Sequence, residues 1–217
     1  MVILKYIKLG VMKFVSHIDV LRNVQLVVRR GEIPIKYSEG FNPHQLLYFS
    51  PPTVLGIGSY AEYVCINTDM DCYEVMDRFN KNSIKDMQAI RAFNVNKDPK
   101  MQAKVVCAEY IVDTPFEGIT IEAKKPYIAT YLVKGEEETG NIGDKIYKVF
   151  DAEGKLGLWL ASGNNNLRVD RVLGQINKDF NRDLVLPDVV KTTQFVDLGK
   201  GYMELDDALE KKLLGFN

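Results

Sequence analysis

A histidine at the expected start of a helix is the residue of this chain best suited to acid–base chemistry. Ser16, His17 and Asp19 lie where a strand-like segment gives way to a helical pattern, and a serine followed three residues later by an acid is typical of a helix N-terminus. The free N–H groups and the positive end of the helix dipole favour an anion there. His17 could therefore hold a phosphate or act as general acid or base in RNA cleavage, or it could only cap the junction. Asp19 could orient His17 or pair with Arg22.

Basic side chains follow His17 along the same helical pattern. Arg22 and Arg29 are seven residues apart and share one helix face, and Arg30 and Lys36 come after them. These four side chains could neutralise phosphates, or they could form an ordinary solvated surface. The first fifty residues carry a net charge of +4 and the remainder −5, although the total is −1. A polyanion-binding segment would explain this asymmetry, and so would chance.

An aromatic, turn-rich segment follows the helix. Tyr37, Phe41 and His44 surround Asn42-Pro43, which is a turn signal. Single-stranded RNA recognition uses aromatic side chains on loops near basic residues for base stacking; the alternative is a loop that buries its own aromatics. The candidate RNA-binding residues are therefore Ser16, His17, Arg22, Arg29, Arg30, Lys36, Tyr37, Phe41, Asn42 and His44.

The sequence lacks the residue patterns that a metal site, a radical-SAM cluster or a membrane span requires. The three cysteines, Cys65, Cys72 and Cys107, are scattered, so we expect no metal site and no cofactor. The Cys-x-x-x-Cys-x-x-Cys motif of radical-SAM enzymes is also absent. No apolar run approaches the roughly 20 residues that a membrane span needs, and the first residues do not resemble a signal peptide. We therefore expect a cytoplasmic protein.

The apolar periodicity and the turn signals of the sequence predict which strands and helices position these residues. The pattern predicts a strand over residues 2–15 that bends at Gly10, a helix from Ser16 to Gly31, strands over 46–49 and 60–67, a helix over 71–82 and a strand over 89–95. In that helix the expected apolar stripe consists of Ile18, Leu21, Val24 and Val28. This βαββαβ order is the ferredoxin-like arrangement.

The remaining residues are expected to repeat this order after a polar linker. The pattern predicts a strand over 105–112, a helix opened by Pro126, a hairpin over 145–160, a helix over 169–180, a strand over 192–196 and a short helix over 204–214. Residues 127–133 also favour a strand. We therefore predict an α+β fold with two tandem ferredoxin-like domains, residues 1–97 and 101–217, each an antiparallel sheet with helices on one face.

Residues 14–63 resemble a known family. The resemblance lies in Phe14-Val15-Ser16-His17-Ile18-Asp19, Arg22, Arg29-Arg30-Gly31-Glu32-Ile33-Pro34, Tyr37-Ser38-Glu39-Gly40-Phe41-Asn42-Pro43-His44, Pro51-Pro52, Gly56 and Ser59-Tyr60-Ala61-Glu62-Tyr63. This pattern is similar to the radical-SAM-linked domain of unknown function of bacteria. In that family the domain ends a radical-SAM protein or is encoded beside one. Ile18 replaces the family's usual Leu, and Gln45 follows His44.

The resemblance implies a partner but no reaction. The layout of this family is similar to that of the tandem ferredoxin-like RNA-binding proteins that include CRISPR repeat-processing endoribonucleases. This similarity is an analogy of fold only. We expect a non-catalytic RNA-binding accessory module that presents structured RNA, such as transfer or ribosomal RNA, to a radical-SAM protein. The alternatives are a metal-independent endoribonuclease that uses His17, and a protein–protein adaptor for the radical-SAM protein without RNA contact. Neither DNA nor a membrane is an expected partner.

Overall fold

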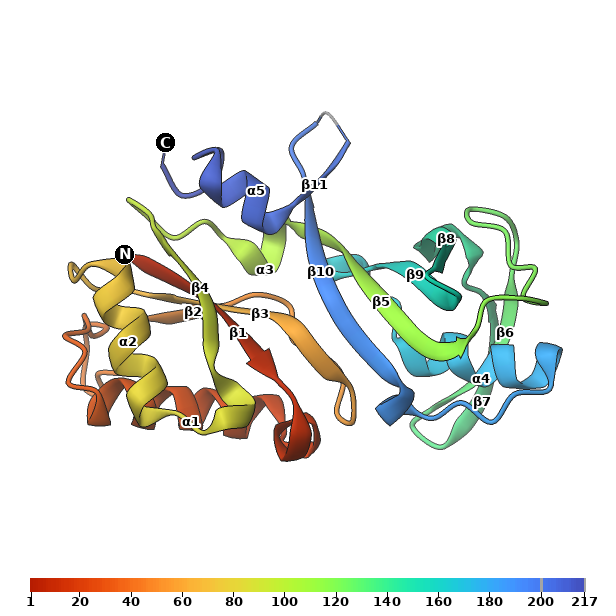
Figure 1. Cartoon of the computed structure of the whole chain (residues 1–217), viewed down its shortest axis with the longest axis horizontal. Coiled ribbons are helices and arrows are strands. Elements are labelled where there is room, and N and C mark those ends of the chain that lie inside the picture. Colours follow the sequence, from red (N-terminus) through yellow and green to blue (C-terminus); the bar gives the residue numbers. More distant parts are fainter. Residues whose placement is uncertain (200, 217) are drawn as a thin grey trace.

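The computed structural model describes residues 1–199 and 201–216, which form a mixed α+β fold built on one large, mostly antiparallel sheet (Figure 1). Its strands and helices are β1 (Val2–Lys8), α1 (His17–Arg30), β2 (Leu47–Phe49), β3 (Gly58–Ile66), α2 (Cys72–Asn82), β4 (Ala89–Asn94), α3 (Met101–Lys104), β5 (Val105–Pro115), β6 (Ile128–Val133), β7 (Glu136–Asn141), β8 (Ile146–Ala152), β9 (Lys155–Ala161), α4 (Val169–Phe180), β10 (Val189–Asp197), β11 (Tyr202–Glu204) and α5 (Leu205–Glu210). The strand order is β4-β1-β3-β10-β5-β9-β8, with β2 also paired to β3 and β11 to β10. No helix in the described ranges is long and apolar enough to cross a membrane.

The N-terminal half has the predicted order of strands and helices. β1 lies between β4 and β3, and β2 pairs with the C-terminal end of β3. All these pairings are antiparallel. Helices α1 and α2 cover one face of this part of the sheet (Figure 1), where their apolar side chains share a core with β1 and β3.

Helix α1 begins and ends as the sequence predicts, but its buried face differs. The Ser16 hydroxyl accepts the N–H of Asp19 at 3.2 Å, and the helix ends before Gly31. The buried residues are Val20, Val24, Val27 and Val28. Ile18, expected in the apolar stripe, is 63% exposed. The face toward the sheet is thus centred on the valines, and it leaves Ile18 on the solvent side.

The predicted strand over residues 2–15 is wrong beyond Lys8. Gly10 adopts a φ of +48°, and residues Gly10–Phe14 form a short 3-10 helix, η1. A side chain at Gly10 would have to displace the Asp86 carboxylate, which accepts the N–H of Val11, and would adopt a strained backbone at this positive φ. This turn leaves the Phe14 ring 58% exposed.

The C-terminal half departs from a second complete βαββαβ unit. The helix predicted at Pro126 is wrong, because β6 pairs with β7 in a separate two-stranded sheet. The β-branched and aromatic residues of 127–133 favour a strand, and this preference outweighs the helix start at Pro126. Helix α4 packs against β6, with the Arg171 guanidinium 3.9 Å from the centre of the Tyr131 ring. The strands β10-β5-β9-β8 form the sheet, and α4 shares a core with it. The tandem ferredoxin-like repeat is therefore not confirmed.

The two halves share one sheet through the parallel pairing of β10 with β3. The second face of the N-terminal sheet is covered by α3 and α5, so the expectation of helices on one face only is wrong. Leu205 and Leu209 of α5 are buried there against residues such as Tyr63 and Phe93. Figure 1 shows α5 on the side of the sheet opposite α1 and α2. A domain boundary at residues 97–101 stays a prediction.

Candidate functional site

The N-terminus of α1 holds a small polar group. The Ser16 hydroxyl donates to one Asp19 oxygen at 2.7 Å, and the other oxygen accepts the Arg22 guanidinium at 3.2 Å. Of the two roles weighed for Asp19, the pairing with Arg22 is the one present. All three side chains are exposed, so this pairing contributes little to stability.

His17 lies at the mouth of a pocket beside this group. Its ring meets the Phe49 ring edge-on, with centroids 5.5 Å apart, and it lines a cavity of about 340 Å³. The other lining residues are Tyr48, Phe49, Asp98, Lys100, Met101, Gln102 and Ala103. Desolvation lowers the pKa of His17, the Glu62 carboxylate opposes this effect, and the Lys8 ammonium adds to it. The imidazole is therefore neutral at pH 7 and able to accept a proton.

The basic residues at the other end of α1 are open to solvent. Arg29 and Arg30 are exposed, and neither forms an ion pair with an acid within residues 1–199 and 201–216. Lys36 is 3.0 Å from an Asp69 oxygen, with both side chains exposed. An exposed pair of this kind is weak and can exchange its acid for a phosphate.

The aromatic loop is closed by two of its own residues. The Ser38 hydroxyl is 2.8 Å from Nδ1 of His44 and accepts the His44 N–H at 3.0 Å, while the Ser38 N–H donates to the His44 carbonyl. Gly40 turns the loop with a φ of +111°. Phe41, at the tip, is fully exposed, and Tyr37 is half exposed. The loop therefore exposes its aromatic side chains to solvent, and the alternative that it buries them in the core is wrong.

The predicted residues form two groups rather than one. Ser16, His17 and Arg22 lie at the N-terminal end of α1, whereas the loop follows its C-terminal end (Figure 1). A helix of 14 residues places these ends about 20 Å apart. The second group consists of Arg29, Arg30, Lys36, Tyr37, Phe41, Asn42 and His44.

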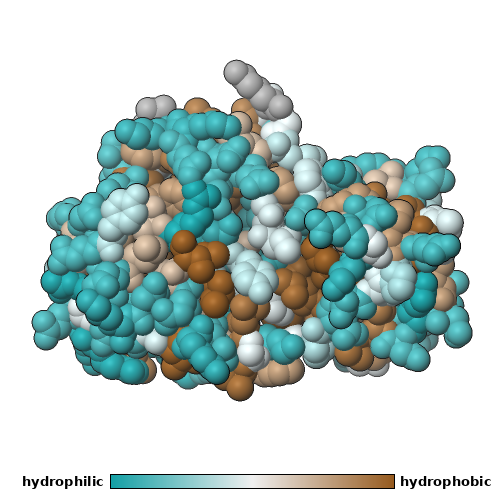
Figure 2. Space-filling model, in the orientation of Figure 1, coloured by the Kyte–Doolittle hydropathy of each residue, from teal (hydrophilic) through white to brown (hydrophobic). Residues whose placement is uncertain are grey.

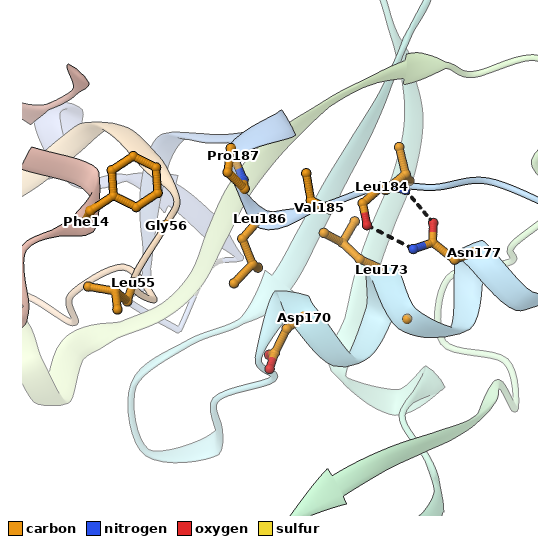
Figure 3. A pocket seen from close by; sticks show the side chains of 11 residues that line it. Phe14, Leu55, Gly56, Asp170, Leu173, Asn177, Leu184, Val185, Leu186 and Pro187 are labelled. Atoms are coloured by element: carbon orange, nitrogen blue, oxygen red, sulfur yellow. Dashed lines mark hydrogen bonds between the residues drawn. The ribbon is translucent and has the colours of Figure 1, made fainter. Parts of the chain in front are cut away.

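Sequence reasoning missed an apolar groove between the halves (Figure 3). It encloses about 530 Å³ and is lined by Phe14 and Leu55 on one side and by residues of α4 and of the segment before β10 on the other, among them Leu173 and Leu186. Apolar residues gather where the halves meet on this face (Figure 2). The lining comes from four separate segments, and no pattern within any one of them indicated the groove.

Sequence reasoning also missed a buried ion pair between the halves. Nζ of Lys191 in β10 lies 2.6 Å from Oε1 of Glu62 in β3 and donates to the Pro51 carbonyl at 3.2 Å. Burial lowers the pKa of Lys191 even though the Glu62 carboxylate opposes this effect. A glutamate inside the strand pattern of residues 60–67 was the one available signal. Within residues 1–199 and 201–216, no group of His, Cys, Asp and Glu side chains could hold a metal ion.

These features define a mixed α+β protein with two exposed polar groups along α1 and an apolar groove between its halves. Residues 2–156 match the model of a family described as "Uncharacterized protein conserved in bacteria (DUF2344)", and the chain belongs to this family. The matched span contains all of the predicted site residues. The predicted membership of a bacterial family of unknown function is confirmed, and its radical-SAM link stays a prediction. No curated protein matches the chain.

Proposed function

We propose that this protein is a non-catalytic RNA-binding module that presents structured RNA to a radical-SAM protein. The observation that carries the proposal is the closed loop of residues 38–44, which holds Phe41 fully exposed beyond the end of α1 that carries Arg29 and Arg30. Guanidinium groups at a helix end that is followed by an exposed aromatic loop suit an RNA whose backbone and unpaired bases are bound together.

The loop binds at low conformational cost because it is already ordered. The hydrogen bonds between Ser38 and His44 fix its two ends, so little freedom is lost when Phe41 meets a base. An exposed phenylalanine gains about 1.5–3 kcal/mol when it is covered. Stacking against a base would supply this gain for any of the four bases.

The opposite face of the N-terminal sheet does not offer an alternative RNA surface. Many RNA-binding domains of this topology stack bases on that face. Here Tyr63 and Phe93 on that face are buried under α5. The proposed RNA surface therefore follows α1 and its loop.

The proposal includes a protein partner, and the apolar groove supports it. Phe14, Leu55 and Val185 are each more than half exposed at this groove. Contiguous exposed apolar surface in a globular protein is typical of an interaction site. The radical-SAM nature of the partner rests on the resemblance of residues 14–63 to the radical-SAM-linked family.

A salt titration of binding to transfer RNA tests the RNA part of the proposal. Affinity should fall steeply with salt because bound phosphates release counterions. The double variant Arg29→Ala, Arg30→Ala should reduce the salt slope by about 1.5–2, whereas Lys178→Ala, an exposed lysine on α4, should leave it unchanged. No measurable RNA affinity at low salt would reject the proposal.

An endoribonuclease is the second candidate, and the pocket at His17 favours it. The neutral imidazole lies at a cavity that also contains Lys100, a cation that could face a phosphate, although it pairs with Asp98 at 3.1 Å. This function predicts that the protein cuts RNA in the presence of a metal chelator. His17→Ala should stop cutting while RNA still binds, and undiminished cutting by this variant would exclude the role.

A further inference from the structure

The cavity beside His17 lies at an open edge of the sheet, the edge of β2. Tyr48 and Phe49 both line this cavity, although the two rings pack against different cores on opposite faces of the sheet. Because neighbouring residues of a strand point to opposite faces, a cavity that both residues line lies beyond the edge of the strand. Helix α3 packs beside β2 and lines the other side of the cavity with Met101 and Ala103.

The backbone N–H and C=O of Phe49 point to this open edge. The Ser50 N–H donates to the Tyr63 carbonyl at 3.1 Å, and the Asn67 N–H donates to the Leu46 carbonyl at 3.1 Å. The even-numbered residues of this segment thus turn their backbone groups toward β3, and the alternation of an antiparallel pair turns those of Phe49 away from it. Neither group of Phe49 forms a hydrogen bond with the part of the chain that the structure describes.

The cavity therefore presents a hydrogen-bond donor and an acceptor side by side on one half-buried residue. Backbone groups of this kind normally find a partner, because leaving them unpaired costs free energy. A ligand that carries an acceptor next to a donor would satisfy both groups of Phe49 at once. Adenine has this arrangement, because its N7 accepts a hydrogen bond and the neighbouring N6 amino group donates one.

The size and the walls of the cavity suit one flat ring. Its volume of about 340 Å³ is at the lower end of the range of small-molecule sites. The strand β2 has only three residues, so this edge is too short to pair with an added peptide strand. The walls from Tyr48, Phe49, Met101 and Ala103 are largely apolar. A ring with apolar faces and a polar edge therefore fits better than a peptide.

The charged groups that line the cavity are paired with each other. The Lys100 ammonium is 3.1 Å from one Asp98 oxygen, and the Lys100 N–H donates to the other oxygen at 2.8 Å. The His17 imidazole is neutral at pH 7 because desolvation lowers its pKa. The lining therefore favours a neutral ring over a phosphate.

The charges around the cavity are also engaged or buried. At the N-terminus of α1, Asp19 is paired with Arg22. Behind the imidazole, Glu62 is paired with Lys191, and Lys8 is 3% exposed. Neither Glu62 nor Lys8 lines the cavity. An uncharged ligand thus meets no unpaired acid of the described residues there.

We propose that the cavity beside His17 binds an unpaired adenine base, whose acceptor and donor pair with the N–H and C=O of Phe49. An adenine in a duplex is not available to such a cavity, so the base comes from a single-stranded or flipped-out nucleotide, or from a free one. The inference rests on the proposed function only in so far as RNA supplies the base. It deepens the second candidate function, which uses the same cavity, but it requires no cleavage.

An NMR titration of the isotope-labelled full chain with adenosine tests the proposal, because the Phe49 amide resonance reports on the proposed hydrogen bond. This resonance should move and saturate. Purine riboside, which lacks the 6-amino group, should bind about three- to tenfold more weakly, because it leaves the Phe49 carbonyl unpaired. Adenosine 5′-monophosphate should bind as tightly as adenosine. Tighter binding of a short oligoadenylate than of the monophosphate would identify RNA as the source of the base, and equal binding would identify a free nucleotide.

Variants at Ala103 separate the cavity from the rest of the surface. Ala103 is an exposed residue that lines the cavity, so a larger side chain there should fill it without disturbing the core. Ala103→Trp should weaken adenosine binding by about tenfold or more, and Ala103→Ser should leave it unchanged. Thermal unfolding should show that both variants fold like the natural chain.

The remaining outcomes distinguish this site from the function proposed above. A Phe49 resonance that adenosine does not move, or adenosine affinity that Ala103→Trp leaves unchanged, would overturn the adenine site even if transfer RNA still binds along α1. Saturable adenosine binding by a chain without affinity for transfer RNA would reject the RNA surface along α1 and retain the site. Binding of the monophosphate more than about tenfold tighter than adenosine, with a steep salt dependence, would assign the cavity to a phosphate and also overturn the proposal.

Discussion

Lys191 and Glu62 form an ion pair of 2.6 Å inside the protein, with 2% and 5% of their side chains exposed. They belong to β10 and β3, the parallel strand pair where the two halves of the sheet meet. Removing two charges from water costs several kcal/mol per ion, and only close contact offsets that cost. This pair therefore links the position of the C-terminal half to that of the N-terminal half.

Glu62→Gln should destabilise the protein by about 3–5 kcal/mol, because it leaves the Lys191 ammonium buried without a counter-charge. Urea denaturation of the variant and of the natural chain measures this difference. The double variant Glu62→Leu, Lys191→Met should recover most of the stability, since neither charge then needs a partner. A single variant as stable as the natural chain would show that the ion pair is not coupled to folding.

Asp206→Ala should also be strongly destabilising, by about 3 kcal/mol or more, because Asp206 fastens α5 to the N-terminal sheet. Its buried carboxylate accepts hydrogen bonds from Lys5 at 2.7 Å, Tyr63 at 2.8 Å and Arg91 at 2.9 Å. The neighbouring Asp207 is the matched control, because its pair with Lys211 is exposed and Asp207→Ala should change stability by about 0.5 kcal/mol or less. Thermal unfolding of both variants makes the comparison, and equal losses would contradict it.

The elements that the sequence predicts well are those whose signals are local. α1 carries a serine cap, an apolar periodicity and a terminating Gly31, and all of these act within the helix itself. Cys65 and Cys107 fall within the predicted strands 60–67 and 105–112, and both are buried, with burial raising the pKa of each thiol to about 12. Such features need no knowledge of the rest of the chain.

The features that the sequence does not reveal depend on tertiary contact. Residues 128–133 suit either a helix or a strand, and pairing with β7 together with packing on α4 decides for the strand. Lys191 and Glu62 are far apart in the sequence, and nothing near either residue indicates the other. The contacts of the Tyr202 ring with Tyr147 and Trp159 likewise require β8, β9 and β11 to be brought together, which the predicted order of elements does not specify by residue.

The imidazole of His17 should titrate below the 6.5 of an unperturbed histidine, because desolvation and the Lys8 charge disfavour its protonated form. At pH values between the lowered pKa of His17 in the folded state and 6.5, the unfolded chain binds more protons than the folded chain. The contribution of His17 to folding stability therefore rises with pH and falls on acidification in this window. NMR titration of the imidazole resonances measures the pKa. The chain has two histidines, so His17→Gln and His44→Gln assign the resonances, and an apparent pKa at or above 6.5 for His17 would contradict the expectation.

Phe41→Ala should weaken RNA binding without changing the stability of the fold. Because the ring is fully exposed, its removal should change the free energy of unfolding by about 0.5 kcal/mol or less. The loss of one stacked base should nevertheless weaken binding to structured RNA by about 1–3 kcal/mol, measured by fluorescence anisotropy of labelled transfer RNA. Ser38→Ala is the complementary variant, because it keeps the ring but removes the two hydrogen bonds of the Ser38 hydroxyl to His44 and leaves the backbone bond between these residues. We expect it to weaken binding less than Phe41→Ala does. If Phe41→Ala binds RNA as tightly as the natural chain, the exposed ring has another partner and the loop is not the RNA contact.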